Sequence, residues 1–454
     1  MTFKLSRRGF LVGCSSAIAA MAGARLTHLA FGDATANAAA GDDVLVVMFL
    51  RGGWDALNVV MPIDGPDRSI YESNRQNLRV PTTGTNKAIP IGGQFGMHPA
   101  MAPLYGLYQS QRLAFVHAVG LPYDTRSHFD AQAMIELGTP GSKTTASGWL
   151  TRHLQSAASL GSNVLIPALS AGNQQAMSLL SYDDAAAFGK PKDFRLYGDW
   201  KYGDPQQAAL RVLYSGDTWL DIAGRETLDK LDALDAAAPG DYVPSGGAAY
   251  PDGSLGDSLK AVAQLIKMQI GLKVATVDFG GWDTHESQGD GSGGYFANQL
   301  GQLAQGLAAF YTDLDACGNG YAQRTTIAVI SEFGRRLQEN SNNGTDHGHG
   351  SLMLVLGGAV NGGKVYGQWP GLAKDQLYDK ADLAVTTDYR RVLSDILINR
   401  CGNDRIDVVF PGYTGYTPMG IVRAGQSVTP PPFPSGANRV FLPIERAGVP
   451  DVCK

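Results

Sequence analysis

The chain alternates continuous apolar runs with stretches in which apolar residues recur at helical spacing. The apolar runs, typical of strands buried on both faces, are Val44–Leu50, Leu113–Val119, Lys273–Val277, Thr326–Ile330 and Leu352–Leu356. Helical patterns lie between and after them, at residues 258–270, 299–314 and from 387 to about 399. This alternation predicts an α/β fold in which a mostly parallel sheet is sandwiched between helices.

Two segments have a different composition from this regular body, which covers residues 43–402. Residues 181–250 are rich in Asp, Ala and Gly, and we expect them to form an insertion or a cap over the sheet. Residues 403–454 are rich in Pro, Gly and aromatic residues, which predicts an extended C-terminal tail draped over the body.

The N-terminus has the features of an export signal. Ser6-Arg7-Arg8-Gly9-Phe10-Leu11 is a twin-arginine element, an Ala/Gly-rich apolar stretch follows it, and Ala36-Asn37-Ala38 is a small-x-small cleavage site. The apolar stretch is too short for a stable membrane span. We therefore expect residues 1–38 to be removed, and the folded chain to be exported by the twin-arginine translocase to the periplasm or beyond.

Removal of this segment makes the chain more acidic. It would leave 33 basic and 41 acidic side chains, a net charge of about −8, which argues against nucleic acid or an anionic membrane as partner. Three cysteines would remain, and an oxidising compartment allows one disulfide among them, with Cys401 and Cys453 the first pair to consider and Cys317 left free.

Polar clusters follow four of the apolar runs directly. Because ligands bind at the carboxyl ends of parallel strands, these clusters mark the candidate functional edge of the sheet. Gly-Gly-Trp-Asp occurs twice in such a place, at 52–55 and 280–283, and its glycines permit a tight turn and a close backbone approach. The repeat makes Asp55 and Asp283 comparable candidates for a site.

The histidines show the same clustering. Six of the seven beyond residue 38 lie near these strand ends or in motif-like strings: His98, His117, His128, His285, His347 and His349. Asp346-His347-Gly348-His349 places three potential ligands in four residues, which predicts a divalent metal, zinc before manganese, iron, calcium or magnesium. The alternative is a hydrogen-bonded polar loop. We interpret His117, inside an apolar run, as a core residue, and His98 as either a turn or a site residue.

Three further groups have two readings each. Ser127 precedes a helical pattern at 128–137, so it is either an ordinary N-cap or, beside a metal, a nucleophile, with Thr125 as the competing hydroxyl. Glu332 and Arg335 form either a structural ion pair or part of an anion site. The tryptophans of the two Gly-Gly-Trp-Asp strings are either packing residues or substrate platforms, and we interpret them as packing residues.

Longer strings around these clusters resemble one family. They are FLRGGWDALNVV, HAVGLPYDTRSHFDAQ, VDFGGWDTHE, SEFGRR and TDHGHGSLMLVLGG, spread over residues 43–402. They resemble the domain-of-unknown-function 1501 family of exported bacterial proteins, which is placed in the alkaline-phosphatase-like, or sulfatase-like, superfamily. The resemblance implies a parallel sheet between helical layers. It also implies hydrolysis or transfer of phosphate or sulfate esters, with one or two metal ions and a Ser, Thr or modified Cys nucleophile.

Carried over residue by residue, the resemblance implies one well-matched metal site. Asp55 is similar to the first-strand Asp that bridges a metal and the nucleophile. Ser127, or else Thr125, is similar to the nucleophile at the start of the second helix. Asp346 and His347 are similar to the Asp-His pair that completes this site.

A second site matches less well. His285, with Asp283 or Asp278, is similar to its Asp…His element, but the spacings here are two and seven residues instead of the usual four. The superfamily supplies a further histidine after the Asp-His pair, and none follows residue 349 in this chain. Either the site is empty, or its last ligand is His349, His98 or His128.

These features predict an exported, metal-dependent hydrolase or transferase that acts on a phosphate- or sulfate-type ester of a small molecule or polymer. The metal would polarise the ester and activate Ser127, while Arg51 or Arg126 would balance the anionic charge. One alternative is a catalytically inactive exported scaffold that binds a metal, a glycan or a protein. Another is a serine hydrolase with a His base, although the chain has no Gly-x-Ser-x-Gly elbow.

Overall fold

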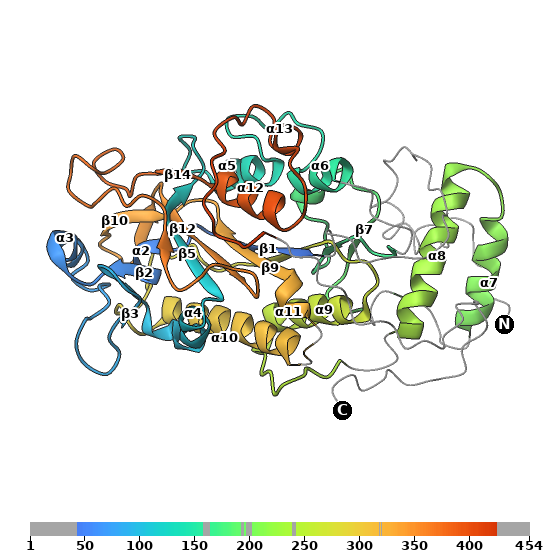
Figure 1. The fold of residues 1–454 in the computed structure, drawn as a ribbon, viewed down its shortest axis with the longest axis horizontal. Helices are drawn as coiled ribbons and strands as arrows, with labels where there is room; N and C mark the ends of the chain where they lie inside the picture. Colours follow the sequence, from blue (N-terminus) through green and yellow to red (C-terminus); the bar gives the residue numbers. More distant parts are fainter. Residues whose placement is uncertain are drawn as a thin grey trace.

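The computed structural model describes residues 43–157, 164–191, 195–196, 202–237, 242–316, 318 and 320–424. The expected signal peptide, Cys317, Cys453 and the tail beyond residue 424 lie outside these ranges. The described chain is a mixed α/β fold with a large central sheet between two layers of helices (Figure 1). No helix within these ranges has the length and apolar character needed to cross a membrane.

The central sheet has nine strands in the order β13-β5-β12-β9-β1-β8-β6-β7, and β14 also pairs with β5. Their bounds are β1 Val44–Leu50, β5 Leu113–Gly120, β6 Ala168–Ser170, β7 Ala185–Ala187, β8 Val274–Phe279, β9 Thr325–Ser331, β12 Ser351–Gly357, β13 Val365–Tyr366 and β14 Thr387–Asp388. All pairings are parallel except those that β12 makes with β5 and β9. The prediction of a mostly parallel sheet is therefore confirmed, with one antiparallel strand.

A hairpin explains the direction of β12. After β9 the chain does not cross over the sheet but folds into β10 (Arg335–Glu339) and β11 (Thr345–His347), which pair antiparallel. The chain therefore re-enters the sheet from the same edge at which β9 ends. This connection places the residues just before β12 at the carboxyl edge of the parallel strands.

The helices pack on both faces of the sheet. One face is covered by α4 Tyr105–Gln109, α9 Ser254–Met268, α10 Tyr295–Asp315, α11 Tyr321–Arg324 and the 3-10 helix η1 Pro99–Leu104 (Figure 1). The other face is covered by α5 His128–Leu137, α6 Trp149–Ser156, α12 Tyr389–Asn399, α13 Ile406–Val409 and the 3-10 helix η2 Met177–Leu179. The remaining elements are α2 Ala56–Val59, α3 Gly65–Asn74, the small sheet of β2 Val60–Pro62, β4 Phe95–Met97 and β3 Ile89–Pro90, and helices α7 Gly203–Leu213 and α8 Trp219–Ala237.

Strand β1 shows why its sequence is apolar without interruption. Val46 and Met48 enter the core beneath α9 and α10, whereas Leu45 and Val47 enter the core beneath α5, α6 and α12. Alternate side chains of a strand point to opposite faces, so a strand covered on both faces needs apolar residues at every position.

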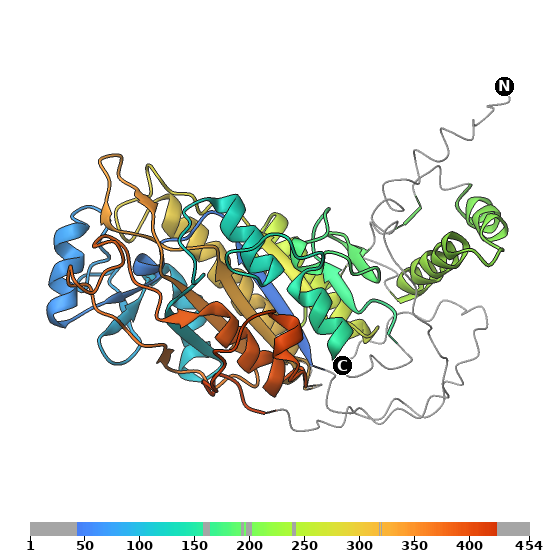
Figure 2. The ribbon, with the colours of Figure 1, turned by 90° about the horizontal axis from the view of Figure 1, so that it is seen from above.

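The segment expected to be an insertion contains the helical hairpin α7–α8. Leu210, Tyr214 and Leu228 form a small apolar cluster of its own. In two perpendicular views the hairpin lies at the opposite end of the molecule from α3 (Figures 1 and 2). It is thus a lateral extension of the body.

The described part of the expected tail, residues 403–424, contains α13 and then follows the body. The buried Asp395 of α12 holds it, since its carboxylate accepts hydrogen bonds from Tyr416 Oη at 3.2 Å and from the backbone N–H groups of Met419 and Ile421 at 2.9 Å each. These bonds attach the segment to α12.

Leu354 lies fully buried in the middle of β12, between β5 and β9. We expect Leu354→Ala to lower the free energy of unfolding by about 2–5 kcal/mol, because the loss of the side chain leaves a cavity. Urea unfolding measures the change. The control Leu213→Ala removes a leucine that is 57 % exposed at the end of α7 and should cost less than about 0.5 kcal/mol. Equal losses in the two variants would contradict the described position of β12.

Candidate metal centre

The candidate site lies at the carboxyl edge of the parallel strands. Leu50, Phe279 and Ser331 end β1, β8 and β9 at the same level. The two Gly-Gly-Trp-Asp turns that follow β1 and β8 are in direct contact there. Gly52 has a φ of +126°, and a Cβ at this position would lie 2.5 Å from the backbone nitrogen of Asp283. Only glycine satisfies both the backbone conformation and this close approach.

Three imidazole rings converge beside these turns. The Nε2 atom of His347, the last residue of β11, lies 2.8 Å from the Nε2 atoms of both His128 and His285. The carboxylate of Asp283 lies 3.2 Å from Nε2 of His347, 3.4 Å from Nε2 of His128 and 3.1 Å from Nε2 of His285. The rings come from three different segments, namely β11, the first turn of α5 and the turn after β8.

The opposite nitrogen of each ring faces a hydrogen-bond acceptor. Nδ1 of His128 lies 2.7 Å from Glu332 Oε1. Nδ1 of His347 lies 2.9 Å from the carbonyl oxygen of Arg126, and Nδ1 of His285 lies 3.2 Å from Asp346 Oδ1. These acceptors favour a proton on Nδ1, and a neutral ring of that tautomer presents a lone pair at Nε2. Two such lone pairs at 2.8 Å repel one another unless a cation, either a proton or a metal ion, lies between them.

These side chains fit a divalent cation. Neutral imidazole nitrogens with one carboxylate oxygen are a ligand set that zinc prefers, and tetrahedral bonds of 2.0–2.1 Å place ligand atoms about 3.3 Å apart. Five of the separations, from 2.8 to 3.4 Å, are close to that value. The ligand atoms of His128, Asp283 and His347 all lie within 4.8 Å of one another, and His285 adjoins this group through His347 and Asp283. Carboxylates and carbonyls on the Nδ1 side are the usual partners of metal-binding histidines.

The electrostatic environment favours the protonation states in which the candidate ligands can bind a metal. Burial by itself would raise the pKa of Asp283, but the hydrogen bond and charge of Arg335, helped by His347 and His128, lower it overall. Burial and the positive charge of Arg335 lower the pKa of His347, which favours the neutral form of this ring. Burial also opposes ionisation of Glu332, yet hydrogen bonds from His128, Gln132 and Gly52 lower its pKa overall.

The group is open to solvent on one side. The side chains of Asp283 and His285 are 47 % and 42 % exposed, whereas those of His128 and His347 are 21 % exposed. A structural metal site is normally closed by protein ligands, while an open side leaves room for water or a substrate.

Asp346 stands behind the group and not in it. Its Oδ1 contacts the Nδ1 of His285 and accepts a hydrogen bond from Asn340 at 3.1 Å. Sequence reasoning grouped Asp346 with His347 as paired ligands. On β11 adjacent side chains point to opposite sides, so only one of the two can face the cation position.

Asp55 is placed in a buried ion pair away from the imidazoles. It is fully buried, and its Oδ2 accepts hydrogen bonds from Arg75 at 2.5 Å and from Gln288 at 2.6 Å. In the structure Asp55 therefore lies apart from the three rings, bound to a guanidinium and an amide. Sequence reasoning missed Arg75, which lies 20 residues further along the chain.

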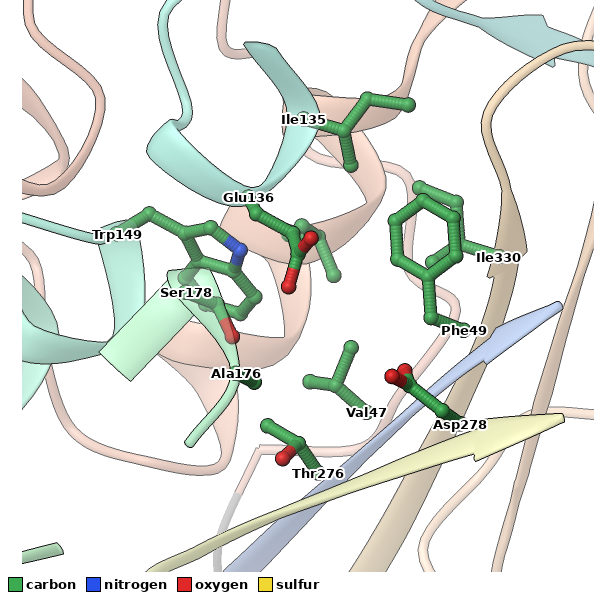
Figure 3. Close-up of a pocket in the computed structure, with 11 residues that line it drawn as sticks. Val47, Phe49, Ile135, Glu136, Trp149, Ala176, Ser178, Thr276, Asp278 and Ile330 are labelled. Atoms are coloured by element: carbon green, nitrogen blue, oxygen red, sulfur yellow. The ribbon is translucent and has the colours of Figure 1, made fainter. Parts of the chain in front are cut away.

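Asp278 and Arg51 form a second separate pair. Arg51 Nη2 contacts both oxygens of Asp278 at 3.0 Å, and Nη1 contacts Glu136 at 2.8 Å. Glu136 and Asp278 line a narrow pocket whose walls are mostly apolar, with Phe49 and Trp149 among them (Figure 3). Arg51 is therefore engaged by two carboxylates and does not serve as a free cation for the imidazole group.

Arg126 and His349 also lie outside the group of three rings. The Arg126 side chain binds Asp382 at 2.7 Å and Asp379 at 3.1 Å, so only its carbonyl oxygen serves the site. The ring of His349 stacks on Tyr378, with 4.1 Å between ring centroids. Neither side chain lies among the three rings in the structure.

The two candidate hydroxyls lie directly before His128. Ser127 is the N-cap of α5, and its exposed Oγ accepts from Asp130 N–H at 3.4 Å, which is long for a hydrogen bond. Thr125 Oγ1 accepts from Ser127 N–H at 3.2 Å. The capping role of Ser127 is observed.

His98 and His117 are structural residues. Each is buried, holds a carbonyl oxygen with Nε2, and accepts a backbone N–H at Nδ1. Burial lowers the pKa of both rings to about 4. Trp54 and Trp282 are also fully buried and pack edge to face, 5.8 Å apart, as interpreted from the sequence.

Sequence reasoning did not assign the residues that hold the ligands. Glu332 and Arg335 were considered as a pair with each other, but they bind His128 and Asp283 instead. Gln132 Nε2 donates a hydrogen bond of 2.8 Å to Glu332 Oε1, the oxygen that His128 also contacts. The signal available was the position of Glu332 directly after β9, at the functional edge.

Comparison with known proteins agrees with part of the resemblance. A family model described as "Protein of unknown function (DUF1501)" matches residues 260–398, from α9 to α12. The matched range contains Asp283, His285, Asp346 and His347, whereas His128 precedes it. Among curated proteins, none matches the chain.

The two Gly-Gly-Trp-Asp turns offer a matched pair of variants. Gly52→Ala should lower the free energy of unfolding by at least about 2 kcal/mol, because alanine is strained at a φ of +126° and its Cβ would displace the turn that carries Asp283. Gly280, the equivalent residue of the second turn, has no atom within 4 Å of a Cβ, so Gly280→Ala should be nearly neutral. Urea midpoints give the comparison, and equal midpoints would refute the contact between the turns.

Because of the buried histidines, we expect the free energy of unfolding to fall in acid. Burial lowers the pKa of His98, His117 and His153 to about 4, below the 6.5 of an exposed ring. Between these values the unfolded chain binds protons that the folded chain does not. Each ring therefore removes about 1.4 kcal/mol of stability per pH unit as the pH falls from 6.5 to 4.

His117→Gln tests this sign. Its free energy of unfolding should fall less steeply than that of the wild type between pH 6.5 and pH 4.5, by about 1.4 kcal/mol per pH unit. Denaturant titrations at several pH values measure the two slopes. Parallel slopes would show that His117 is protonated alike in both states.

Proposed function

We propose that this protein is an exported metal-dependent hydrolase or transferase with an alkaline-phosphatase-like core, acting on phosphate- or sulfate-type esters. His128, His285, His347 and Asp283 would hold one divalent cation, with zinc first. The observation that carries this proposal is the meeting of three Nε2 atoms and a carboxylate at a partly open strand edge. The twin-arginine element at the N-terminus supports export.

A cation held there would supply Lewis acidity, which polarises an ester oxygen and makes a nearby hydroxyl or water more acidic. The chain's own residues prepare this position. Glu332, Asp346 and the carbonyl of Arg126 hold protons on the Nδ1 atoms, so that the rings keep their orientation. Arg335 keeps Asp283 ionised.

Ser127 is the proposed nucleophile. It is exposed, it precedes His128 directly, and its long bond to Asp130 N–H leaves the hydroxyl available. Thr125 is the alternative, although its Oγ1 accepts a shorter bond from Ser127 N–H. Because Arg51 and Arg126 already bind carboxylates, the charge of the ester would be balanced chiefly by the cation.

A binding protein without catalysis is the second candidate. Within the described residues one group of potential metal ligands is found; it consists of His128, Asp283 and His347, and His285 lies beside it. Asp55, Asp278 and His349, which the resemblance or their position assigned to metal sites, contact other side chains. A single-cation site of this kind also suits an inactive scaffold.

The amount of bound metal distinguishes both candidates, the metal-dependent enzyme and the metal-binding protein, from a chain that binds no metal. After reconstitution with zinc, the wild type should hold about one equivalent per chain, and His347→Ala should hold close to none, because His347 contacts both other rings. The control His349→Ala removes a ring of the same loop that stacks on Tyr378, and it should retain the metal. Elemental analysis after gel filtration measures all three, and a metal-free wild type would refute the proposal.

Turnover of an aryl phosphate, a bis-aryl phosphodiester and an aryl sulfate then tests catalysis. We expect at least one to be hydrolysed by the zinc form, and not after chelation or in His347→Ala. Ser127→Ala should lower kcat by two orders of magnitude or more, since the covalent route is lost. Stoichiometric zinc with no turnover of any ester would favour the binding protein.

A further inference from the structure

Gln288 lies buried between the two segments that carry the candidate ligands. It is 1 % exposed, and its Oε1 accepts hydrogen bonds from Thr284 Oγ1 at 2.8 Å and from Thr345 Oγ1 at 3.1 Å. Thr284 stands between Asp283 and His285 in the chain, and Thr345 precedes Asp346 and His347. One amide oxygen therefore joins the turn after β8 to strand β11.

The other end of this amide is anchored by Asp55. Gln288 Nε2 donates to Asp55 Oδ2 at 2.6 Å, and Arg75 donates to the same oxygen. A carboxylate cannot donate, so the amide has one possible orientation, with its oxygen toward the two threonines. Arg75 also donates to the carbonyls of Arg336 and Leu337 at 2.9 Å, which ties β10 to the same anchor.

The contacts of Gln288 bear on the distance between the imidazoles. His285 Nε2 and His347 Nε2 are 2.8 Å apart, and they belong to the two segments that Gln288 joins. A backbone hydrogen bond from Thr345 N–H to the Thr284 carbonyl, at 3.0 Å, lies beside the amide. Arg335 also links the turn to the strand through the carbonyls of Trp282 and Thr345, and Asn340 does so through His285 O and Asp346 Oδ1. The amide adds the side-chain link between Thr284 and Thr345.

We propose that Gln288, oriented by Asp55, is a positioning residue of the metal centre: it sets the separation between the Asp283–His285 turn and the His347 strand. The proposal rests on the proposed function, because it presumes that these residues hold a cation. It gives Asp55 a role that differs from that of a ligand, namely to orient the side chain that spaces the ligands.

The test is the affinity of the full chain for cobalt(II), followed by its visible absorption, which reports ligand number and geometry. Gln288→Leu keeps the approximate size of the side chain and removes all three hydrogen bonds. We expect it to weaken cobalt binding by about 10- to 100-fold, as does the loss of other groups that orient metal ligands. The absorption band should also change in shape, which a change in global stability alone would not produce.

Asp313→Asn is the matched control. Asp313 is equally buried and accepts hydrogen bonds from Tyr242, Tyr250, Ser245 and Lys267. It lies near the C-terminal end of α10, 18 residues from its first residue, which corresponds to about 27 Å along the helix. This variant should lose stability but bind cobalt with the affinity and spectrum of the wild type.

Thr345→Val provides a second variant if Gln288→Leu does not fold, since it removes one hydroxyl contact and leaves the bond between Gln288 and Asp55. It should weaken cobalt binding by a smaller factor, in the same direction. If the Gln288 and Thr345 variants bind cobalt with the same affinity and spectrum as Asp313→Asn, the positioning role is overturned and the proposed function stays intact. A wild type that binds neither cobalt nor zinc would overturn both.

Discussion

The buried guanidinium of Arg335 joins the segments on which the candidate site depends. It is fully buried and donates to the carbonyl oxygens of Gly52, Gly53, Trp282 and Thr345 and to the carboxylate of Asp283. These acceptors come from the turn after β1, the turn after β8 and strand β11. A planar group with five donors can hold three backbone segments at once, which a lysine in the same place could not do. The close approach of the two Gly-Gly-Trp-Asp turns follows from this arrangement.

The charges of the site are arranged in pairs, and this affects the chemistry that it can perform. Arg335 is paired with Asp283, and Arg51 and Arg126 have carboxylate partners of their own. Buried carboxylates without such partners would be costly, so these pairs keep the fold stable while engaging all three guanidiniums. Under the proposed function, a cation held by the imidazoles would attract an anionic ester, so metal binding is the property on which that proposal stands.

The fold was predicted closely where the sequence pattern reflects burial alone. Strand β1 has the predicted bounds, and α12 begins after Asp388, whose side chain caps it as its residue type suggests. The direction of β12 was not predictable, because an apolar run reads the same in either direction and depends on the path of the preceding hairpin. The prediction that polar clusters would share one edge needed only parallel strands. Which side chains at that edge face one another needed the hairpin as well.

The sequence by itself determined the α/β architecture, the edge that carries the polar clusters, and the histidine-rich strings from which His285 and His347 come. Apolar periodicity and residue type are local properties, so they can be read along the chain. Only the tertiary structure decided that His128 joins these two rings and that Asp55 does not, because each outcome depends on a distant partner. Glu332 lies 204 residues from His128, and Gln288 lies 233 residues from Asp55. Both Asp55 and Asp283 find a guanidinium, and no local pattern encodes that only Asp283 also faces the imidazoles.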